Sequence, residues 1–189
     1  MRKIFIARVM ELEELTKEVK GAIRPVPFKG IERFFDISGI LLIPSLFQAT
    51  LDQLAKVVSS LKPDYICALD SRGFLIGAPL SIMLKVPLVM IRKEGKLPGA
   101  CHQITYNKEY ETGDVFEIQE QAVKSHSRIV IVDDVIATGG SMRAAFLLLE
   151  RFEPVTVTGV CLMDLGLEVS KTLKLDGKEV ISLFNASGW

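Results

Sequence analysis

The strongest constraint on the fold is an alternation, from residue 64 onward, between short apolar segments and longer segments with helical spacing. The apolar segments have the length of strands; they are "DYICALD", "PLVMIR", "RIVIVDD", "VTVTGVCLMD" and "EVISLF". The helix-like segments between them are "RGFLIGAPLSIMLK", "GGSMRAAFLLLERF" and "LEVSKTLK". Strands that are apolar on both faces and joined by helices form parallel sheets covered on both sides. The pattern therefore predicts an α/β fold with a doubly wound, mainly parallel sheet flanked by helices.

Two regions depart from this alternation. Apolar residues recur at helical spacing over residues 5–23 and again over 46–61, which predicts two amphipathic helices. Between them we expect a loop-like segment, "VPFKGIERFFDIS". Residues 93–119 are polar and irregular, with a possible hairpin around residues 112–114. Long loops in compact domains usually carry function, so this second region is the candidate flexible lid.

The composition is that of a soluble globular protein, with 49% hydrophobic and 24% charged residues. Lys+Arg and Asp+Glu are equal at 23, whereas a general nucleic-acid binder carries a basic surplus. Three dispersed cysteines, Cys67, Cys101 and Cys161, predict a reducing, cytoplasmic compartment without a disulfide framework or a zinc site. The first residues lack the pattern of a signal peptide, and no uncharged stretch reaches the length of a bilayer span. We therefore expect neither export nor a membrane.

The segment "IVIVDDVIATGGSMR", residues 129–143, is the most informative about chemistry. Asp133 and Asp134 end a predicted buried strand, and a helix is predicted to begin near Gly140. Ligands of parallel sheets bind beyond the carboxyl ends of the strands, where helix N-termini point. Residues 138–141 therefore offer N–H groups and hydroxyls to a phosphate, and the paired acids suit vicinal hydroxyls. No Walker A lysine is present, so the pattern indicates a ribose 5-phosphate; a helix cap with two solvent-facing acids is the alternative.

These residues resemble the phosphoribosyl-pyrophosphate (PRPP) motif of the type I phosphoribosyltransferases, and "VIVDDVIATGGS" is most similar to the adenine phosphoribosyltransferase family. "LDSRGFLIGAPL" and "IRKEGKLPG" resemble two further motifs of that family, in the right order and spacing. With "YNKEYETGDVFEI" and "FFDIS", the resemblance covers most of residues 25–145. It implies purine salvage: transfer of 5-phosphoribose from PRPP to adenine, giving AMP and pyrophosphate. It also implies a homodimer, and Mg²⁺ held mainly by substrate oxygens and water.

The resemblance implies roles for individual residues. The 5-phosphate would bind Ala137, Thr138, Gly139, Gly140 and Ser141. Pyrophosphate would bind Ser71, Arg72, Arg92, Lys93 and Lys96, and the base would contact Phe34, Phe35 and Ile136. The catalytic residues would be Glu109, Asp133, Asp134 and Arg72, with no side chain reserved for a metal. Glu109 would handle the proton of the base, and Tyr110 would close over the site as part of the lid. In the family, the turn after "LD" often contains a cis peptide bond that does not precede proline.

We expect a single phosphoribosyltransferase domain over residues 1–189. Its N-terminal helix and a small base-binding hood would span about 1–40, its core about 41–92 and 125–189, and its lid about 93–119. "GIERFFDIS" departs from the family's usual Phe-Arg-Asp, because Phe35 directly precedes Asp36. The hood's contacts to the base therefore stay open.

From the residues alone, several alternatives stay open. Phe34 and Phe35 could serve the core, and Arg72 and Glu109 could be ordinary surface residues. Two other functions are compatible with the same fold: a phosphoribosyltransferase for a 6-oxopurine or orotate, and a non-enzymatic PRPP-sensing regulator. A 6-oxopurine enzyme needs a donor to O6, usually a lysine beside the strand after the phosphate loop, and "VTVTGVCLMDLG" carries none. The neutral net charge argues against a nucleic-acid-binding regulator.

Overall fold

The computed structural model describes residues 10–28, 31–106, 113–166, 174–175 and 177–189. The chain forms two compact units, Met1–Gln53 and Leu54–Trp189. Within the described residues, no helix combines the length and the apolar character needed to cross a bilayer.

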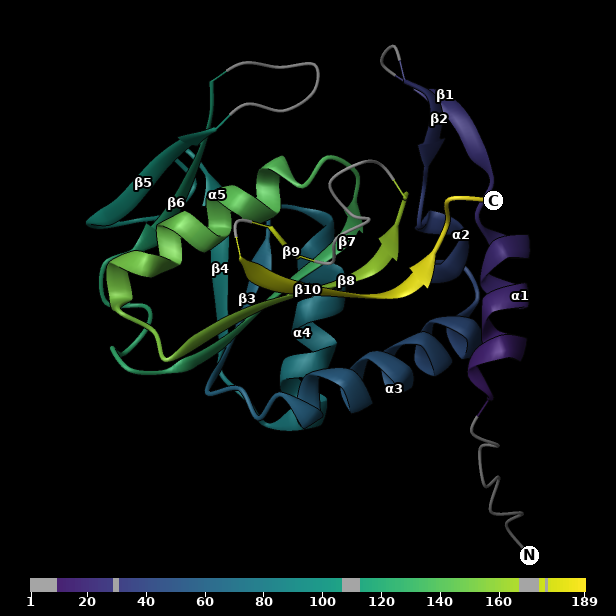
Figure 1. Cartoon of the computed structure of the whole chain (residues 1–189), viewed down its shortest axis with the longest axis horizontal. Coiled ribbons are helices and arrows are strands. Elements are labelled where there is room, and N and C mark those ends of the chain that lie inside the picture. Colours follow the sequence, from purple (N-terminus) through teal and green to yellow (C-terminus); the bar gives the residue numbers. More distant parts are fainter. Residues whose placement is uncertain (1–9, 29–30, 107–112, 167–173, 176) are drawn as a thin grey trace, which may run out of the picture. The chain divides into compact units, whose positions relative to one another are not determined.

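The first unit contains helices and a small β-hairpin (Figure 1). Its elements are α1 (Leu12–Ala22), β1 (Pro25–Phe28), β2 (Ile31–Phe35), α2 (Ser38–Leu41) and the first part of α3 (Pro44–Ser60). Helix α1 buries Leu15 and Val19, one turn apart, as the apolar spacing predicts. The prediction of a loop around residues 26–38 is wrong, because β1 and β2 pair antiparallel. Two prolines are tolerated there because each strand of a two-stranded sheet needs partners on one side only.

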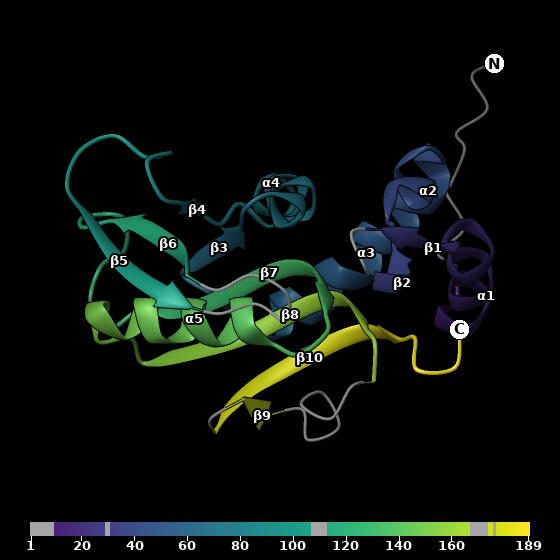
Figure 2. The same cartoon turned by 90° about the horizontal axis from the view of Figure 1, so that it is seen from above.

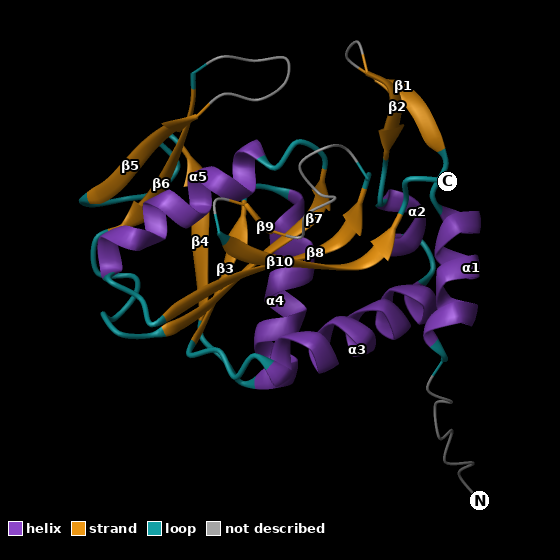
Figure 3. Ribbon diagram, viewed as in Figure 1, coloured by secondary structure: helices purple, strands orange, loops and turns teal. Residues whose placement is uncertain are grey.

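The second unit is built on an eight-stranded sheet in the order β5-β6-β4-β3-β7-β8-β10-β9 (Figure 3). The strands are β3 (Tyr65–Leu69), β4 (Leu88–Lys93), β5 (Cys101–Tyr106), β6 (Asp114–Gln119), β7 (Arg128–Ile136), β8 (Thr156–Asp164), β9 (Lys174–Leu175) and β10 (Lys178–Asn185). The five central strands, in the order β4-β3-β7-β8-β10, are parallel. Strands β6 and β5 at one edge and β9 at the other join by antiparallel pairing. The predicted α/β class with a mainly parallel sheet is confirmed.

Two helices cover opposite faces of this sheet (Figure 2). Ala68 of β3 faces α4 (Arg72–Leu84), since a Cβ added at Gly77 would lie 2.7 Å from the Ala68 Cβ. Its neighbours Cys67 and Leu69 belong to the apolar core cluster that includes α5 (Gly140–Leu149). Successive side chains of a strand point to opposite faces, so α4 and α5 lie on different sides of β3. A short 3₁₀ turn, Glu150–Phe152, follows α5.

The region predicted to be irregular is more ordered than expected. Strands β5 and β6 pair antiparallel over residues 101–106 and 114–119, so the prediction of irregular structure there is wrong. These two strands form a hairpin, as predicted, but Asp114 already belongs to β6; the turn predicted around residues 112–114 lies partly outside the described residues and stays a prediction. The predicted helix over residues 167–174 falls almost wholly outside the described residues.

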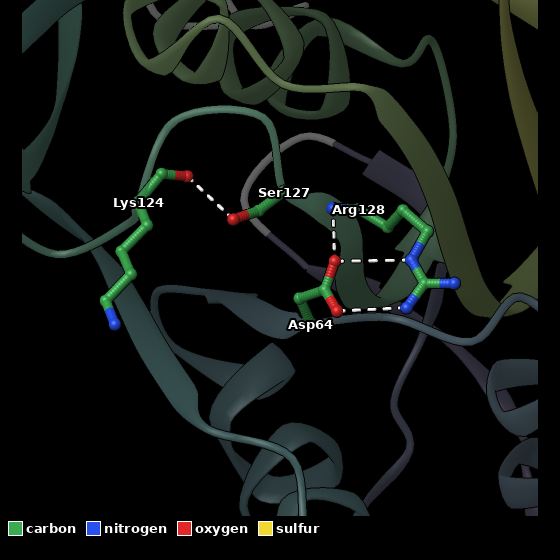
Figure 4. A network of polar contacts seen from close by, with 4 residues as sticks. All are labelled: Asp64, Lys124, Ser127 and Arg128. Carbon is green, nitrogen blue, oxygen red and sulfur yellow. Dashed lines mark hydrogen bonds and ion pairs between the residues drawn. The ribbon is translucent and has the colours of Figure 1, made fainter.

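A charged pair joins Asp64, the residue before β3, to Arg128, the first residue of β7, at the edge where the parallel strands begin (Figure 4). Arg128 donates to Asp64 from its backbone N–H (2.8 Å), from Nε (3.2 Å) and from Nη2 (3.0 Å). The Asp64 N–H in turn donates to the Arg128 carbonyl at 2.8 Å. Next to it, the Ser127 hydroxyl donates to the Lys124 carbonyl. These bonds fix the relative register of two central strands, and the carboxyl ends of the same strands carry the residues described next.

Candidate active site

The carboxyl ends of β3 and β7 are followed by two of the predicted site loops. One ion pair joins the first of these loops to β7. Arg72 begins α4 directly after β3, and its Nε lies 2.9 Å from Oδ2 of Asp134 on β7. The Asp134 side chain is 5% exposed, whereas that of Arg72 is 34% exposed. The acid is therefore enclosed while the guanidinium keeps access to solvent. The peptide bond between Asp70 and Ser71 is cis, as the family resemblance implies.

Asp133 and Asp134 occupy different environments, as expected for successive residues of a strand. Asp133 is half-buried, and its Oδ1 accepts the backbone N–H of Asp134 at 2.9 Å. Burial, followed by the charge of Asp134, raises the pKa of Asp133 well above its usual range. Burial also raises the pKa of Asp134, and the opposing charge of Arg72 limits that rise. Burial therefore disfavours the ionised form of both acids. Acids with raised pKa values of this kind are typical of functional sites.

Strand β7 continues to Ile136, two residues beyond the acids that were predicted to end it, and the backbone of the first turn of α4 lies directly against β7 at Val132 and Asp133. A Cβ built on Gly73 would lie 2.7 Å from the Val132 carbonyl oxygen and 3.2 Å from Oδ1 of Asp133. Only glycine permits that approach. The predicted pyrophosphate turn and the predicted ribose acids are therefore in direct contact.

The predicted 5-phosphate loop has the form of an anion-binding helix start. Gly139 is the residue before α5 and has φ +81°, a left-handed conformation that favours glycine. Its carbonyl accepts the N–H of Arg143, and α5 begins at Gly140, as predicted. Ala137, Thr138 and Ser141 are half-buried. Free N–H groups of a first helical turn, with hydroxyls beside them, bind phosphate.

The predicted pyrophosphate cations lie at the end of β4 and in the turn that follows. Arg92 places Nε 3.2 Å from Oδ2 of Asp70 and donates from Nη1 to the Lys96 carbonyl at 3.1 Å. Its guanidinium also lies over the Phe74 ring. Lys93 forms an ion pair with Asp114 at 3.6 Å. Because β3 and β4 are parallel neighbours, these cations share the edge that carries Arg72.

Sequence reasoning missed three residues that contact the predicted ones. Asp70 and Asp114 pair with Arg92 and Lys93, and Tyr106 donates to Asp114 at 3.5 Å. Burial raises the pKa of Tyr106 to about 12, and a hydrogen bond with the Ser141 side chain opposes that rise. Asp70 had a visible signal, because it directly precedes the "SRG" turn. Asp114 and Tyr106 lie within "YNKEYETGDVFEI", but that segment did not indicate their contacts, which depend on strand pairing.

For the remaining predicted residues, the described contacts do not test the assigned roles. Phe34 and Phe35 belong to the first unit, where the Phe34 ring packs at a tilt against that of Phe28 and Phe35 is buried. Ile136 ends β7 and is buried in the core. Glu109 and Tyr110 lie outside the described residues. The roles assigned to these five residues stay predictions.

Comparisons with known proteins agree with this geometry. A family model described as phosphoribosyl transferase domain matches residues 38–186. An adenine phosphoribosyltransferase of Rhodospirillum rubrum is 42% identical over 157 residues, which cover 83% of this chain and 88% of the relative. Adenine phosphoribosyltransferase 1 of Saccharomyces cerevisiae is 44% identical over 151 residues, covering 76% and 80% of the two chains.

Solved structures give the same result. The Saccharomyces cerevisiae adenine phosphoribosyltransferase, complexed with an imino-altritol bisphosphate and adenine, has a TM-score of 0.78 and 39% identity, covering 91% of this chain and 99% of that one. The Trypanosoma brucei adenine phosphoribosyl transferase, in complex with AMP, pyrophosphate and ribose-5-phosphate, has a TM-score of 0.82 and 25% identity, covering 92% and 80%. With a family model that matches most of its length and relatives more than 40% identical over most of both chains, the chain belongs to the adenine phosphoribosyltransferase family.

Proposed function

We propose that this protein transfers 5-phosphoribose from PRPP to adenine, giving AMP and pyrophosphate. The observation that carries this proposal is that two anion-binding turns follow neighbouring strands at one sheet edge, and that Arg72 of the first turn pairs at 2.9 Å with Asp134, shortly before the second turn. PRPP carries a 5-phosphate and a pyrophosphate on one ribose, so it needs two such turns a sugar apart. Helix α5 begins at one turn and α4 at the other.

The residues would act mainly by binding and by stabilising charge. In the reaction, N9 of adenine attacks ribose C1 while pyrophosphate leaves from the opposite face. Arg72, Arg92, Lys93 and Lys96 would spread the charge of the leaving group, the effect that usually dominates such catalysis. Asp133 and Asp134 would bind the ribose hydroxyls, directly or through water. Glu109 would take the proton that adenine loses.

Mg²⁺ is the metal that fits this chemistry, held mainly by substrate oxygens and water. Asp134 is already paired with Arg72, and one oxygen of Asp133 accepts a backbone N–H, so these acids offer few free ligand positions. Across the described ranges, no three His, Cys, Asp or Glu side chains gather into a metal site. When bound, Mg²⁺ would neutralise charge on the pyrophosphate. Activity should fall on treatment with EDTA and return when Mg²⁺ is added.

Adenine is the base that the family membership favours. The relatives above include one solved with adenine and one solved with AMP. Strand β8 follows the phosphate loop and carries no lysine to donate to O6 of a 6-oxopurine. Phe34, Phe35 and Ile136 are the proposed base contacts.

A competition assay tests the proposed function. The protein would be given Mg²⁺, PRPP and equal concentrations of adenine, hypoxanthine, guanine, xanthine and orotate, and the nucleotides formed would be quantified. AMP should dominate. A different nucleotide would assign another base, and no nucleotide together with salt-dependent binding to RNA or DNA would favour the regulator.

We also propose a homodimer that uses the α4 face of the second unit. Exposed apolar side chains gather there: Leu75 is 46% exposed, Ile82 78% and Met83 38%, all on α4. Met90 of β4 is 45% exposed and pairs in register with Ala68, which places it on the same face as α4. Exposed apolar patches of this kind are covered in protein interfaces. Sedimentation should give twice the mass of one chain, and Ile82→Glu should lower it toward the monomer. The cytoplasmic location stays a prediction.

A further inference from the structure

Glu117, on β6, is a buried acid to which no role has yet been given. The residue is 5% exposed. Its Oε2 accepts the backbone N–H of Gly95 at 2.9 Å, and its Oε1 accepts from Nε2 of Gln103 at 2.6 Å. In the sheet it stands between Arg92 on β4 and Gln103 on β5. One carboxylate therefore joins three consecutive strands to the turn that follows β4.

Burying a carboxylate is costly unless hydrogen bonds satisfy it. Here each oxygen has a donor, and both donors are neutral groups. A neutral apolar residue at this position would avoid the cost of burial. An acid at position 117 is informative because its carboxylate holds a neighbouring turn in place.

What it holds is the turn that carries the pyrophosphate cations. The Lys96 N–H donates to the Lys93 carbonyl at 3.3 Å, which closes a four-residue turn, and Gly95 within it has φ +72°. That closing bond does not involve the Gly95 N–H. The Glu117 carboxylate accepts this N–H instead. Arg92 also donates to the Lys96 carbonyl of this turn.

We propose that Glu117 is a positioning residue for pyrophosphate. By holding the N–H of Gly95, it fixes the turn in the one conformation in which Arg92, Lys93 and Lys96 present their charges together. Glu117 need not touch the substrate; it acts through the turn. This inference rests on the proposed function, because pyrophosphate is the anion that the turn would receive.

Two substitutions of Glu117 separate its hydrogen bonds from its charge. Glu117→Leu removes both acceptors. Glu117→Gln keeps an oxygen for the Gly95 N–H, and its amide can donate to Gln103 once that side-chain amide is flipped. Glu120→Leu is the matched control, since Glu120 is an exposed acid just beyond β6.

Glu117→Leu should raise the KM for PRPP roughly 10- to 100-fold, the range expected for losing a hydrogen bond to a charged group. Calorimetry with pyrophosphate and Mg²⁺ should show a matching loss of affinity. The KM for adenine at saturating PRPP should not move, whereas a generally damaged fold would affect both substrates. Glu117→Gln should stay within about threefold of the parent, and Glu120→Leu should match it.

If Glu117→Leu fails to fold, Gln103→Leu replaces it, because Gln103 is exposed and its loss frees only one carboxylate oxygen. A smaller rise in the KM for PRPP, in the same direction, is then expected. A folded Glu117→Leu protein with parental constants for PRPP and pyrophosphate would overturn the proposal, as would parental constants for Gln103→Leu where that variant is used. If the parent protein forms no AMP from adenine and PRPP, the proposed function fails instead.

Discussion

Nε of Arg72 lies 2.9 Å from Oδ2 of Asp134, so one charged pair connects the turn after β3 to the end of β7. The Asp134 side chain is enclosed, and the Arg72 side chain is partly exposed to solvent. A pair of this kind fixes the orientation of the guanidinium. Substituting either Arg72 or Asp134 should therefore also disturb the other residue of the pair.

Asp134→Asn should reduce turnover roughly 10²-fold or more, the scale seen when a preorganised charge at a reaction centre is lost. The amide has no charge to orient Arg72 or to bind the ribose hydroxyls strongly. Steady-state kinetics would measure the change, and circular dichroism would verify the fold. Activity within about twofold of the parent would exclude the assigned role.

Asp133→Asn should make the protein more stable at neutral pH while it impairs activity. Burial and the charge of Asp134 raise the pKa of Asp133, so ionising it costs more in the folded chain than in the unfolded one. That cost is absent at low pH, where the group is protonated in both states; it grows as pH rises above the unfolded pKa and is complete above the folded pKa. The amide oxygen can still accept the Asp134 N–H.

Thermal unfolding would measure this effect. A gain in Tm of about 2–4 °C near pH 8 corresponds to roughly 1 kcal/mol for a chain of this length. The gain should shrink as pH is lowered. An equal gain at every pH would mean that packing, and not ionisation, is responsible.

Ser141→Asp should weaken PRPP binding far more than adenine binding. Ser141 lies in the first turn of α5, and a carboxylate there would replace a donor with a charge that repels the 5-phosphate. Calorimetry with each ligand would separate the two affinities. Ser141→Ala, which removes the hydroxyl without adding charge, should have a much smaller effect. Unchanged PRPP affinity in Ser141→Asp would place the phosphate elsewhere.

Glu109→Gln tests whether this acid handles the proton of the base. If it does, kcat should fall about 10²–10⁴-fold, the usual scale of general acid–base catalysis, with little change in PRPP affinity. Product release can hide a slower chemical step, so a pre-steady-state single-turnover rate is the measurement. An unchanged rate would leave catalysis to the stabilisation of the leaving group.

Asp64→Asn should lower thermal stability without affecting activity, because Asp64 lies at the sheet edge where the strands begin. Hydrogen bonds from Arg128 lower the pKa of Asp64 in the folded protein. Its contribution to stability is therefore present above the unfolded pKa and is lost as pH falls through the folded pKa. The Tm difference between parent and variant should close in acid. A difference that persists in acid would mean that the charge of Asp64 is not its cause.

The parts of the site that local sequence could predict are those made by consecutive residues. The acids of β7, the glycine turn and the start of α5 at Gly140 follow one another in the chain, so strand and helix patterns locate them. Glu117 and Asp114 could not be found in this way. Their contacts to Gly95 and Lys93 depend on how β6 pairs with its neighbours, and side-chain periodicity does not determine the pairing of strands.

The elements of the fold also divide into those that local sequence identifies and those that it does not. The central strands are buried on both faces and gave continuous apolar runs that identified them. Strand β5 lies at the sheet edge and is largely exposed or half-buried, so its sequence appeared irregular. The hairpin of the first unit was obscured by Pro25 and Pro27, residues that normally argue against a strand.

The contact of Gly73 with Val132 and Asp133 limits how enzymes of this kind can be redesigned. The distance between the α4 turn and the β7 acids is determined by backbone atoms, since no side chain fits between them. A library randomised at position 73 should therefore return glycine alone among active clones, whatever base or sugar is selected for. New specificity would have to come from residues around this contact, because substitutions cannot change the spacing between the α4 turn and the β7 acids.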